Sequence, residues 1–171
     1  MKYIGCNGKL ILLVGVVMLF GFSCSLVSDG CGQRFSKEYC DDPFWISQIG
    51  DTYTYRIRNA SVDGDSIAIE FKGFCGRDTV WELISNRDVL LPYELDISHV
   101  QAEVLKLVLI HEGTGGIRTI YSNGMDRLAP IELTPGKHTI KLIGYSAQGN
   151  LRMKMDIPLG VLAIDRFTDR W

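Results

Sequence analysis

The chain has 171 residues, with 18 basic and 20 acidic side chains and a formal net charge of −2. Charges of both signs are mixed along the sequence and form no basic stripe, which argues against nucleic-acid binding and against electrostatic attachment to anionic lipid. Hydrophobic residues make up 46% of the chain, which is enough for a globular domain with a core of its own.

The first 23 residues have the composition of an export signal. Lys2 and Lys9 form a basic start, and residues 10–22 are apolar apart from two glycines. This stretch of 13 residues is too short for a transmembrane helix, which needs roughly 20 apolar residues. It fits the apolar region of a secretory signal peptide, which has about 7 to 15 residues. We therefore predict a cleaved signal peptide at residues 1–23, with an uncleaved anchor helix as the alternative.

Small residues and a cysteine follow the apolar stretch. The four residues Gly21-Phe22-Ser23-Cys24 resemble the lipobox of bacterial lipoproteins, in which a small residue precedes the modified cysteine. The resemblance implies that Cys24 becomes the mature N-terminus, carries fatty acyl chains and anchors the protein in the cell envelope. Ser25 stands where an Asp implies retention in the inner membrane of some bacteria, so the outer membrane is favoured. The alternative is ordinary cleavage, which leaves Cys24 for a disulfide.

Residues 24–40 are predicted to be the lipidated cysteine and a flexible tether. They are rich in Ser, Gly and charged residues without a hydrophobic period, as in linkers. Residues 25–39 reach roughly 50 Å when fully extended at about 3.3 Å each, which would hold a domain clear of a membrane. A single folded domain is predicted at residues 41–171.

Three cysteines remain if the signal is removed and Cys24 is lipidated. An extracytoplasmic location lets a disulfide persist, and three thiols permit three single pairings. We favour Cys40–Cys75, because Cys75 directly follows a predicted strand and Cys40 lies shortly before that strand's partner. Cys31 lies in the predicted tether, and its pairings stay open. A metal site is disfavoured, since the sequence contains no CxxC pair.

The predicted domain begins with a β-hairpin. Apolar and polar residues alternate over residues 52–58 and again over residues 67–72, and Asp63-Gly64 lies between the two runs. A period of two is typical of a half-buried strand, and Asp-Gly is typical of a hairpin turn because Gly tolerates positive φ. We expect both strands to turn one apolar face toward a core.

Further strand candidates follow at short spacing, separated by turns rich in Gly, Pro and Asn. They are residues 79–84, 104–112, 117–121, 139–145 and 151–157. Gln148-Gly149-Asn150 is predicted to be the turn between the last two. Residues 97–110 also contain good helix formers, and we predict at most one short helix, a helical turn near residues 98–103 from Ser98 as a candidate N-cap to Glu103, that runs into a strand.

Many short strands with Gly-rich turns are typical of an all-β, antiparallel sandwich or barrel. The predicted fold is an immunoglobulin-like β-sandwich, with a jelly roll as the alternative. Residues 133–142, which include Pro135-Gly136, resemble a turn and strand found in extracytoplasmic β-domains such as PEGA-type repeats. This resemblance covers ten residues, so it supports a β fold and identifies no family.

No catalytic motif occurs in the sequence. His99, His111 and His138 lie at predicted strand ends or turns, where we expect exposed polar side chains, and the second His of a zinc-protease motif is missing after His111. Asp63 and Asp65 fit a turn, because the Glu that completes a calcium-binding loop is absent. Aromatic residues at alternating positions are expected in the core rather than on a sugar-stacking platform: Tyr53, Tyr55, Trp81, Tyr121 and Tyr145.

The sequence therefore predicts a membrane-anchored envelope lipoprotein whose β-sandwich binds a protein, glycan or cell-wall partner without catalysis. It predicts no catalytic residue, no metal, no cofactor and no nucleic-acid partner. One alternative is a small extracytoplasmic hydrolase, since a dispersed active site leaves no local motif. Another is an adhesion or assembly subunit that accepts a strand at an exposed sheet edge.

Overall fold

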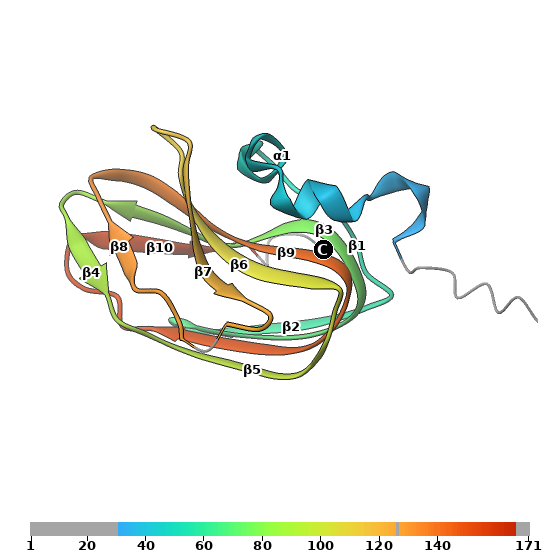
Figure 1. The fold of residues 1–171 in the computed structure, drawn as a ribbon. Coiled ribbons are helices and arrows are strands. Elements are labelled where there is room, and N and C mark those ends of the chain that lie inside the picture. Colours follow the sequence, from blue (N-terminus) through green and yellow to red (C-terminus); the bar gives the residue numbers. More distant parts are fainter. Residues whose placement is uncertain (1–30, 126, 167–171) are drawn as a thin grey trace, which may run out of the picture.

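The computed structural model describes residues 31–125 and 127–166 (Figure 1). The predicted signal peptide, Cys24 and the first part of the predicted tether lie outside the described residues. The helical elements are the 3-10 helices η1 (Gly32–Arg34) and η2 (Lys37–Asp41) and the α-helix α1 (Pro43–Ser47). The strands are β1 (Thr52–Thr54), β2 (Ile57–Asp63), β3 (Ser66–Ser85), β4 (Val89–Leu91), β5 (Tyr93–Gln101), β6 (Val104–His111), β7 (Gly116–Ser122), β8 (Ile131–Leu133), β9 (Gly136–Met155) and β10 (Val161–Asp165).

Two strands of 20 residues each, β3 and β9, organise the fold. They pair with each other antiparallel over nearly their whole length, from Ser66 opposite Lys154 to Ser85 opposite Gly136. Both bend near their middle, so their halves lie in two facing layers of one sheet (Figure 1). The predicted all-β antiparallel sandwich is confirmed. Its two layers share β3 and β9, whereas an immunoglobulin domain divides its strands between two separate sheets.

The two layers differ in their strands. The four-stranded layer contains β2, the first half of β3, the second half of β9, and β5, in that order. The five-stranded layer contains β10, the second half of β3, the first half of β9, β6 and β7, and β1 joins the same edge of β3 near the bend. β4 and β8 form a separate two-stranded sheet whose apolar side chains reach the main core.

Bulges and a glycine create the bend in the long strands. The β3–β9 pairing shifts register between Phe71 and Phe74 and again between Phe74 and Gly76. A Cβ atom at Gly144 would lie 2.5 Å from the ring of Phe74, so only glycine allows this close approach. The turn predicted at residues 148–150 is wrong, because this segment continues β9 through the bend. Bulges bend a strand without ending it, which explains turn-like residues inside β9.

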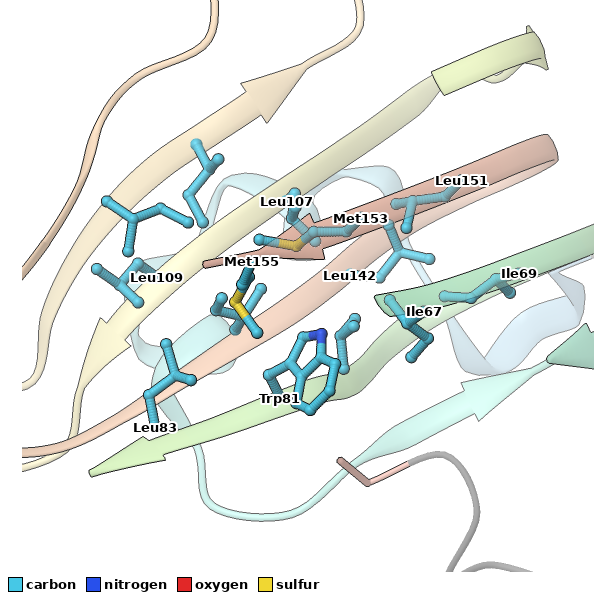
Figure 2. Packing of buried hydrophobic residues seen from close by; sticks show 14 of the residues in the cluster. Ile67, Ile69, Trp81, Leu83, Leu107, Leu109, Leu142, Leu151, Met153 and Met155 are labelled. Carbon is cyan, nitrogen blue, oxygen red and sulfur yellow. The ribbon is translucent and has the colours of Figure 1, made fainter. Parts of the chain in front are cut away.

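The main core lies between the two layers and follows the predicted alternation. Figure 2 shows Trp81 of β3, Leu107 of β6 and Met153 of β9 pointing into the same space. The predicted hairpin is confirmed, since Asp63 pairs with Ser66 across a turn in which Gly64 has φ 59°. The strand before this turn is β2 rather than residues 52–58, and the aromatic residues of those positions pack at the bend.

The short helix predicted near residues 98–103 is wrong. Most of this segment belongs to β5, in which Ile97 lies opposite Leu151 of β9 and packs against the main core. Pairing with β9 therefore overrides the local preference for a helix. The strand is irregular at this point, because its register shifts between Ser98 and Gln101 and His99 has φ 54°.

A helical layer, formed by η1, η2 and α1, covers part of the outer face of the five-stranded layer (Figure 1). Asp42 caps α1 by accepting a hydrogen bond from the Phe44 amide at 2.9 Å, and Pro43 occupies the first turn. Ile46 of α1 packs against Val108 of β6 in a second core. β6 is therefore buried on both faces, which explains its nearly continuous apolar sequence.

The predicted Cys40–Cys75 disulfide is wrong. The structure joins Cys31 to Cys75, with the two Cα atoms 5.2 Å apart, and leaves Cys40 as a buried free thiol. Cys40 points into the second core beside Ile46, and burial raises its pKa to about 11 despite the nearby charge of Lys106. Cys31 lies in the predicted tether, but in the structure it lies directly before η1 and is bonded to Cys75 at the bend of β3.

The described part of the predicted tether is folded. Residues 31–40 form η1 and most of η2, and Phe35 is buried beside the Cys31–Cys75 disulfide. The expectation of a flexible tether is wrong for these residues, because three buried side chains fix them to the sheet: Cys31, Phe35 and Cys40. Residues 24–30 of the predicted tether lie outside the described residues.

Candidate functional site

The outer face of the four-stranded layer is polar, and we call it the polar face. Side chains alternate between the two faces of a strand, so the residues between those of the core all point outward here. They form three rows across β2, β3, β9 and β5. The rows are Asn59–Glu70–Asn150–Ser98, Ser61–Ala68–Arg152–Asp96 and Asp63–Ser66–Lys154–Glu94.

Two adjoining hollows lie over the middle row of the polar face. Their volumes are about 580 Å³ and about 440 Å³, and both are lined by Ser61, Ala68, Asp96 and Arg152. Ala68 is the one residue of the three rows without a polar side chain, and its small size leaves room between the longer side chains around it. The first hollow extends to His99, where β5 is irregular.

The side chains that surround the hollows have few partners within the protein. Among residues 31–125 and 127–166, Asn59 donates a hydrogen bond to Glu70 at 3.1 Å, and neither Arg152 nor Asp96 forms a side-chain hydrogen bond or ion pair. Arg152 carries five N–H donors, and Asp96 and the amide oxygen of Asn150 supply acceptors. The polar face therefore presents donors and acceptors to solvent, arranged around a recess.

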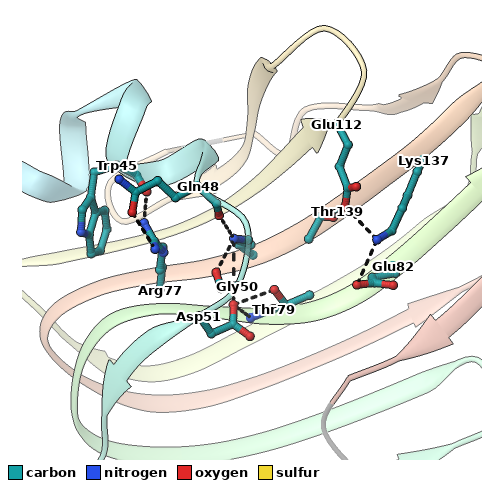
Figure 3. A network of polar contacts seen from close by, with 11 residues as sticks. Trp45, Gln48, Gly50, Asp51, Arg77, Thr79, Glu82, Glu112, Lys137 and Thr139 are labelled. Carbon is teal, nitrogen blue, oxygen red and sulfur yellow. Dashed lines mark hydrogen bonds and ion pairs between the residues drawn. The ribbon is translucent and has the colours of Figure 1, made fainter.

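Polar residues on the opposite face hold the helical layer in place (Figure 3). The buried Lys141 ammonium donates to the carbonyl oxygens of Gln48 at 2.7 Å and Gly50 at 2.9 Å. The buried Arg77 guanidinium donates to the carbonyl oxygen of Trp45 and to Oε1 of Gln48, and it lies over the Trp45 ring. Asp51 accepts from the amide and the hydroxyl of Thr79.

A half-buried charge cluster lies near these contacts, beside a hollow of about 420 Å³. Lys137 contacts Glu82 at 3.3 Å and Glu112 at 3.1 Å (Figure 3). Arg166 contacts Glu82 at 2.7 Å. Burial alone would raise the pKa of Glu82, but hydrogen bonds and charge from Arg166 and Lys137 outweigh it and hold that pKa below its ordinary value. Burial alone would lower the pKa of Lys137, but hydrogen bonds and charge from Glu112 and Glu82 outweigh it and raise that pKa above its ordinary value.

These shifts make the charge cluster unsuited to proton transfer near neutral pH. A general acid or base works best when its pKa lies close to the working pH. Glu82 is moved away from neutrality on the acidic side and Lys137 on the basic side, so both keep their charges. The paired charges therefore stabilise this edge of the sheet.

A second buried charge pair lies inside the core at the bend. Arg58 contacts Asp78 at 3.4 Å, and the Tyr55 hydroxyl donates to Asp78 at 2.8 Å. Burial, followed by the charge of Asp78, raises the pKa of Tyr55 well above its ordinary value. All three side chains belong to the interior between the layers, so the pair has a structural role.

The three histidines do not come together in one site. His138 is buried, which corrects the expectation of exposed histidines, and its Nε2 lies 2.8 Å from the carbonyl oxygen of Thr134. Its ring lies edge-on to that of His111, and burial lowers the pKa of His138. His111 accepts a hydrogen bond at Nδ1 from the Thr114 amide. His99 belongs to β5, in the other layer of the sandwich, and lines the first hollow of the polar face.

The other residues considered in the sequence have structural positions. Asp63 and Asp65 flank the β2–β3 turn, and no group of three or more potential metal-ligating side chains occurs in the part of the chain that the structure describes. The aromatic residues are confirmed as parts of the packing, since Trp81 is buried and the four tyrosines pack against the cores. No helix among the described elements is long and apolar enough to cross a bilayer.

Sequence reasoning missed two features of the site. The role of Cys31 had no local signal, because its partner lies 44 residues away. The polar face was also overlooked, since any half-exposed sheet has alternating polar residues. The signal that distinguishes it is the small Ala68 among longer polar side chains, and this becomes visible only when the strand register places four strands side by side.

Comparisons with known proteins give no relative from which a function can be transferred: no protein-family model matches the chain, and no curated protein matches its sequence.

Proposed function

We propose that the chain is a non-catalytic, lipid-anchored protein of the cell envelope that binds a cell-wall glycan through the polar face. The observation that carries this proposal is the pair of hollows whose surrounding donors and acceptors have few partners within the described chain. Recognition sites use a small number of convergent polar groups to orient a ligand. The export signal and the resemblance at Cys24 support an envelope location.

A glycan fits the polar face better than a protein does. The centre of a protein interface is usually rich in aromatic and other apolar anchors. The three rows of the polar face contain Ala68 as their one apolar residue and otherwise carry hydroxyl, amide and charged groups. Such groups match the hydroxyls of a sugar, each of which donates and accepts hydrogen bonds.

The alternatives have less support. The charge cluster around Glu82 has pKa values displaced from neutrality, which disfavours it as the acid–base pair of a hydrolase. Strand addition would need an accessible edge. Among the described strands of the main sheet, β1, β2, β5, β7 and β10 each pair on one side only. β2 carries Arg58 and Asp63, β5 carries Glu94 and a bulge, and β7 carries the exposed Arg118. Charges and bulges protect an edge from pairing.

The proposal is tested by co-sedimentation of the lipidated protein with purified peptidoglycan sacculi and by titration with soluble glycan fragments. We expect the wild type to sediment with sacculi, and Arg152→Ala to weaken binding by about tenfold or more, since a charged hydrogen bond contributes about 1.5–3 kcal/mol. Arg118→Ala is the matched control, because Arg118 is an exposed arginine on β7, outside the polar face.

Three results bear on the proposal. Loss of binding in Arg152→Ala but not in Arg118→Ala would support it. Equal binding by all three proteins, or no binding by the wild type, would contradict it. Capture of an envelope protein in place of glycan, with the same dependence on Arg152, would replace the glycan with a protein partner.

A further inference from the structure

Large apolar side chains are exposed on the side of the molecule opposite the polar face. Phe44 of α1 is 74% exposed, and Ile49, in the loop after α1, is 95% exposed. Ile84 of β3 and Leu162 of β10 lie opposite each other and are 41% and 56% exposed. They point outward, because their neighbours Leu83 and Ala163 face the main core. We call these four residues the apolar face.

The polar face has no comparable group. Its strands expose one large apolar side chain among the described residues, Ile57 at 38%. The two outer faces of the sandwich therefore differ in character, and Phe44 and Ile49 belong to the helical layer and the loop that follows it. Apolar surface left in water is unfavourable in proportion to its area, so these exposed side chains favour a partner that covers them.

The Cys31–Cys75 disulfide limits how far this side can lie from an anchor at Cys24. Seven residue steps separate Cys24 from Cys31, and a fully extended chain spans at most about 3.6 Å per residue, so their reach is roughly 25 Å. This is half of the reach that the sequence predicts for the whole tether. Cys31 begins the helical layer, so that layer is the part of the described domain tied most closely to the anchor.

We propose that the apolar face rests on the bilayer into which the Cys24 lipid inserts, with Phe44 and Ile49 entering the interfacial region. This inference rests on the lipid anchor of the proposed function. A short tether raises the effective concentration of the bilayer at the helical layer, so a weak apolar contact suffices to orient the domain. The polar face is then turned away from the bilayer, toward the cell wall.

The charges near the apolar face indicate that this contact is driven by apolar insertion. Lys37 contacts Glu103 at 3.5 Å, and Lys106 contacts Asp41. The basic residues of the charge cluster, Lys137 and Arg166, are likewise paired with carboxylates. Arg34 of η1 is the one basic side chain of the helical layer that is exposed and has no ion pair among the described residues, so docking should depend only weakly on salt and on the fraction of anionic lipid.

The test uses the lipidated protein in nanodiscs of phosphatidylethanolamine and phosphatidylglycerol that contain a spin-labelled lipid. Broadening of amide resonances is mapped along the chain. We expect strong broadening at Phe44 and Ile49 and little at Asp96 and Arg152. Removing each inserted side chain, in Phe44→Ser and Ile49→Ser, should lower the docked population by about tenfold, as expected for withdrawing a large apolar side chain from an apolar environment.

Ile57→Ser is the matched control, because it removes an exposed apolar side chain from the opposite side and should leave docking unchanged. Equal broadening on both faces, or stronger broadening on the polar face, would overturn the inference. Mass spectrometry of the N-terminus separates the two proposals. An unmodified Cys24 would remove the anchor and this inference together, whereas a lipidated protein that binds sacculi but shows no preferred orientation would overturn the inference alone.

Discussion

The two outer faces of the sandwich contain the same kinds of residue in opposite roles. β9 contributes a lysine to each face, Lys141 to the five-stranded layer and Lys154 to the four-stranded layer. Lys141 is buried under the helical layer and bonded to two carbonyl oxygens. Lys154 is exposed in the outer row of the polar face, beside the second hollow. Whether a strand's outward residues serve structure or recognition therefore depends on what covers them.

This difference explains how a small domain can keep one polar surface available. Buried charges are tolerated only when paired and hydrogen-bonded, and Arg77 and Lys141 meet that condition through the helical layer. The polar face has no such cover among the described residues, so its charges are hydrated.

Replacing Lys141 with methionine should destabilise the fold far more than the same change at Lys154. Lys141→Met leaves the carbonyl oxygens of Gln48 and Gly50 without their donor and removes the charge next to Asp51, 4.0 Å away. We expect a loss of about 3–5 kcal/mol in the free energy of unfolding, against less than about 0.5 kcal/mol for Lys154→Met. Urea unfolding measures both, and equal losses would refute the contrast between the faces.

Removing the disulfide should have the next largest effect. Cys31→Ser opens a crosslink between residues separated by 44 positions, and should lower the free energy of unfolding by about 2–4 kcal/mol. Cys40→Ala removes a free buried thiol and should cost about 1 kcal/mol. Peptide mapping of the oxidised protein should find Cys31 joined to Cys75, and a Cys40–Cys75 peptide would contradict the structure.

Filling the hollow of the polar face should weaken binding without weakening the fold. Ala68→Met places a longer side chain on the floor shared by both hollows. Overfilling such a site costs about 1–3 kcal/mol, so the affinity for glycan should fall by about tenfold or more. Thr114→Met, at an exposed turn, should bind as the wild type does. Titration calorimetry with soluble glycan measures both affinities. Equal affinities of the two variants would contradict a binding role for the hollows.

The smallest effect concerns acid stability. Because the folded-state pKa of Glu82 is lowered, its contribution is present above the unfolded carboxyl pKa of about 4.3 and is lost as the pH falls through the folded value. Glu82→Gln should therefore cost about 1 kcal/mol at neutral pH and show a shallower loss of stability below about pH 4.3. Glu70→Gln, on the polar face, should keep the wild-type acid profile. Identical acid profiles for both variants would contradict the contribution of the Glu82 carboxylate to stability.

The strands could be predicted where one face meets the core and the other meets water. The hairpin around Asp63-Gly64 and the strand at residues 117–121 follow from alternation and turn residues alone. β9 could not be predicted as one strand, because Gly149 and its neighbours look like a turn when the partner strand is unknown. β6 resembled a helix in part because the helical layer buries its second face.

The candidate site depended even more on long-range structure. Cys31 lies in a sequence that looks like a linker, and only the position of Cys75 at the bend reveals its role. The polar face is assembled from four strands drawn from residues 57–155, so no short motif contains it. The anchor proposed at Cys24 rests on local composition alone and stays a prediction, since Cys24 lies outside the described residues.

The most direct test of the account is whether the polar face is occupied in the cell. A cysteine introduced by Ser61→Cys lies on the wall shared by both hollows, and its labelling by a membrane-impermeant thiol reagent can be measured in opened envelopes and in purified protein. We predict rapid labelling of the purified protein, protection in envelopes, and loss of that protection when Arg152→Ala is added. Equally rapid labelling in envelopes and in purified protein would show that the polar face has no partner there.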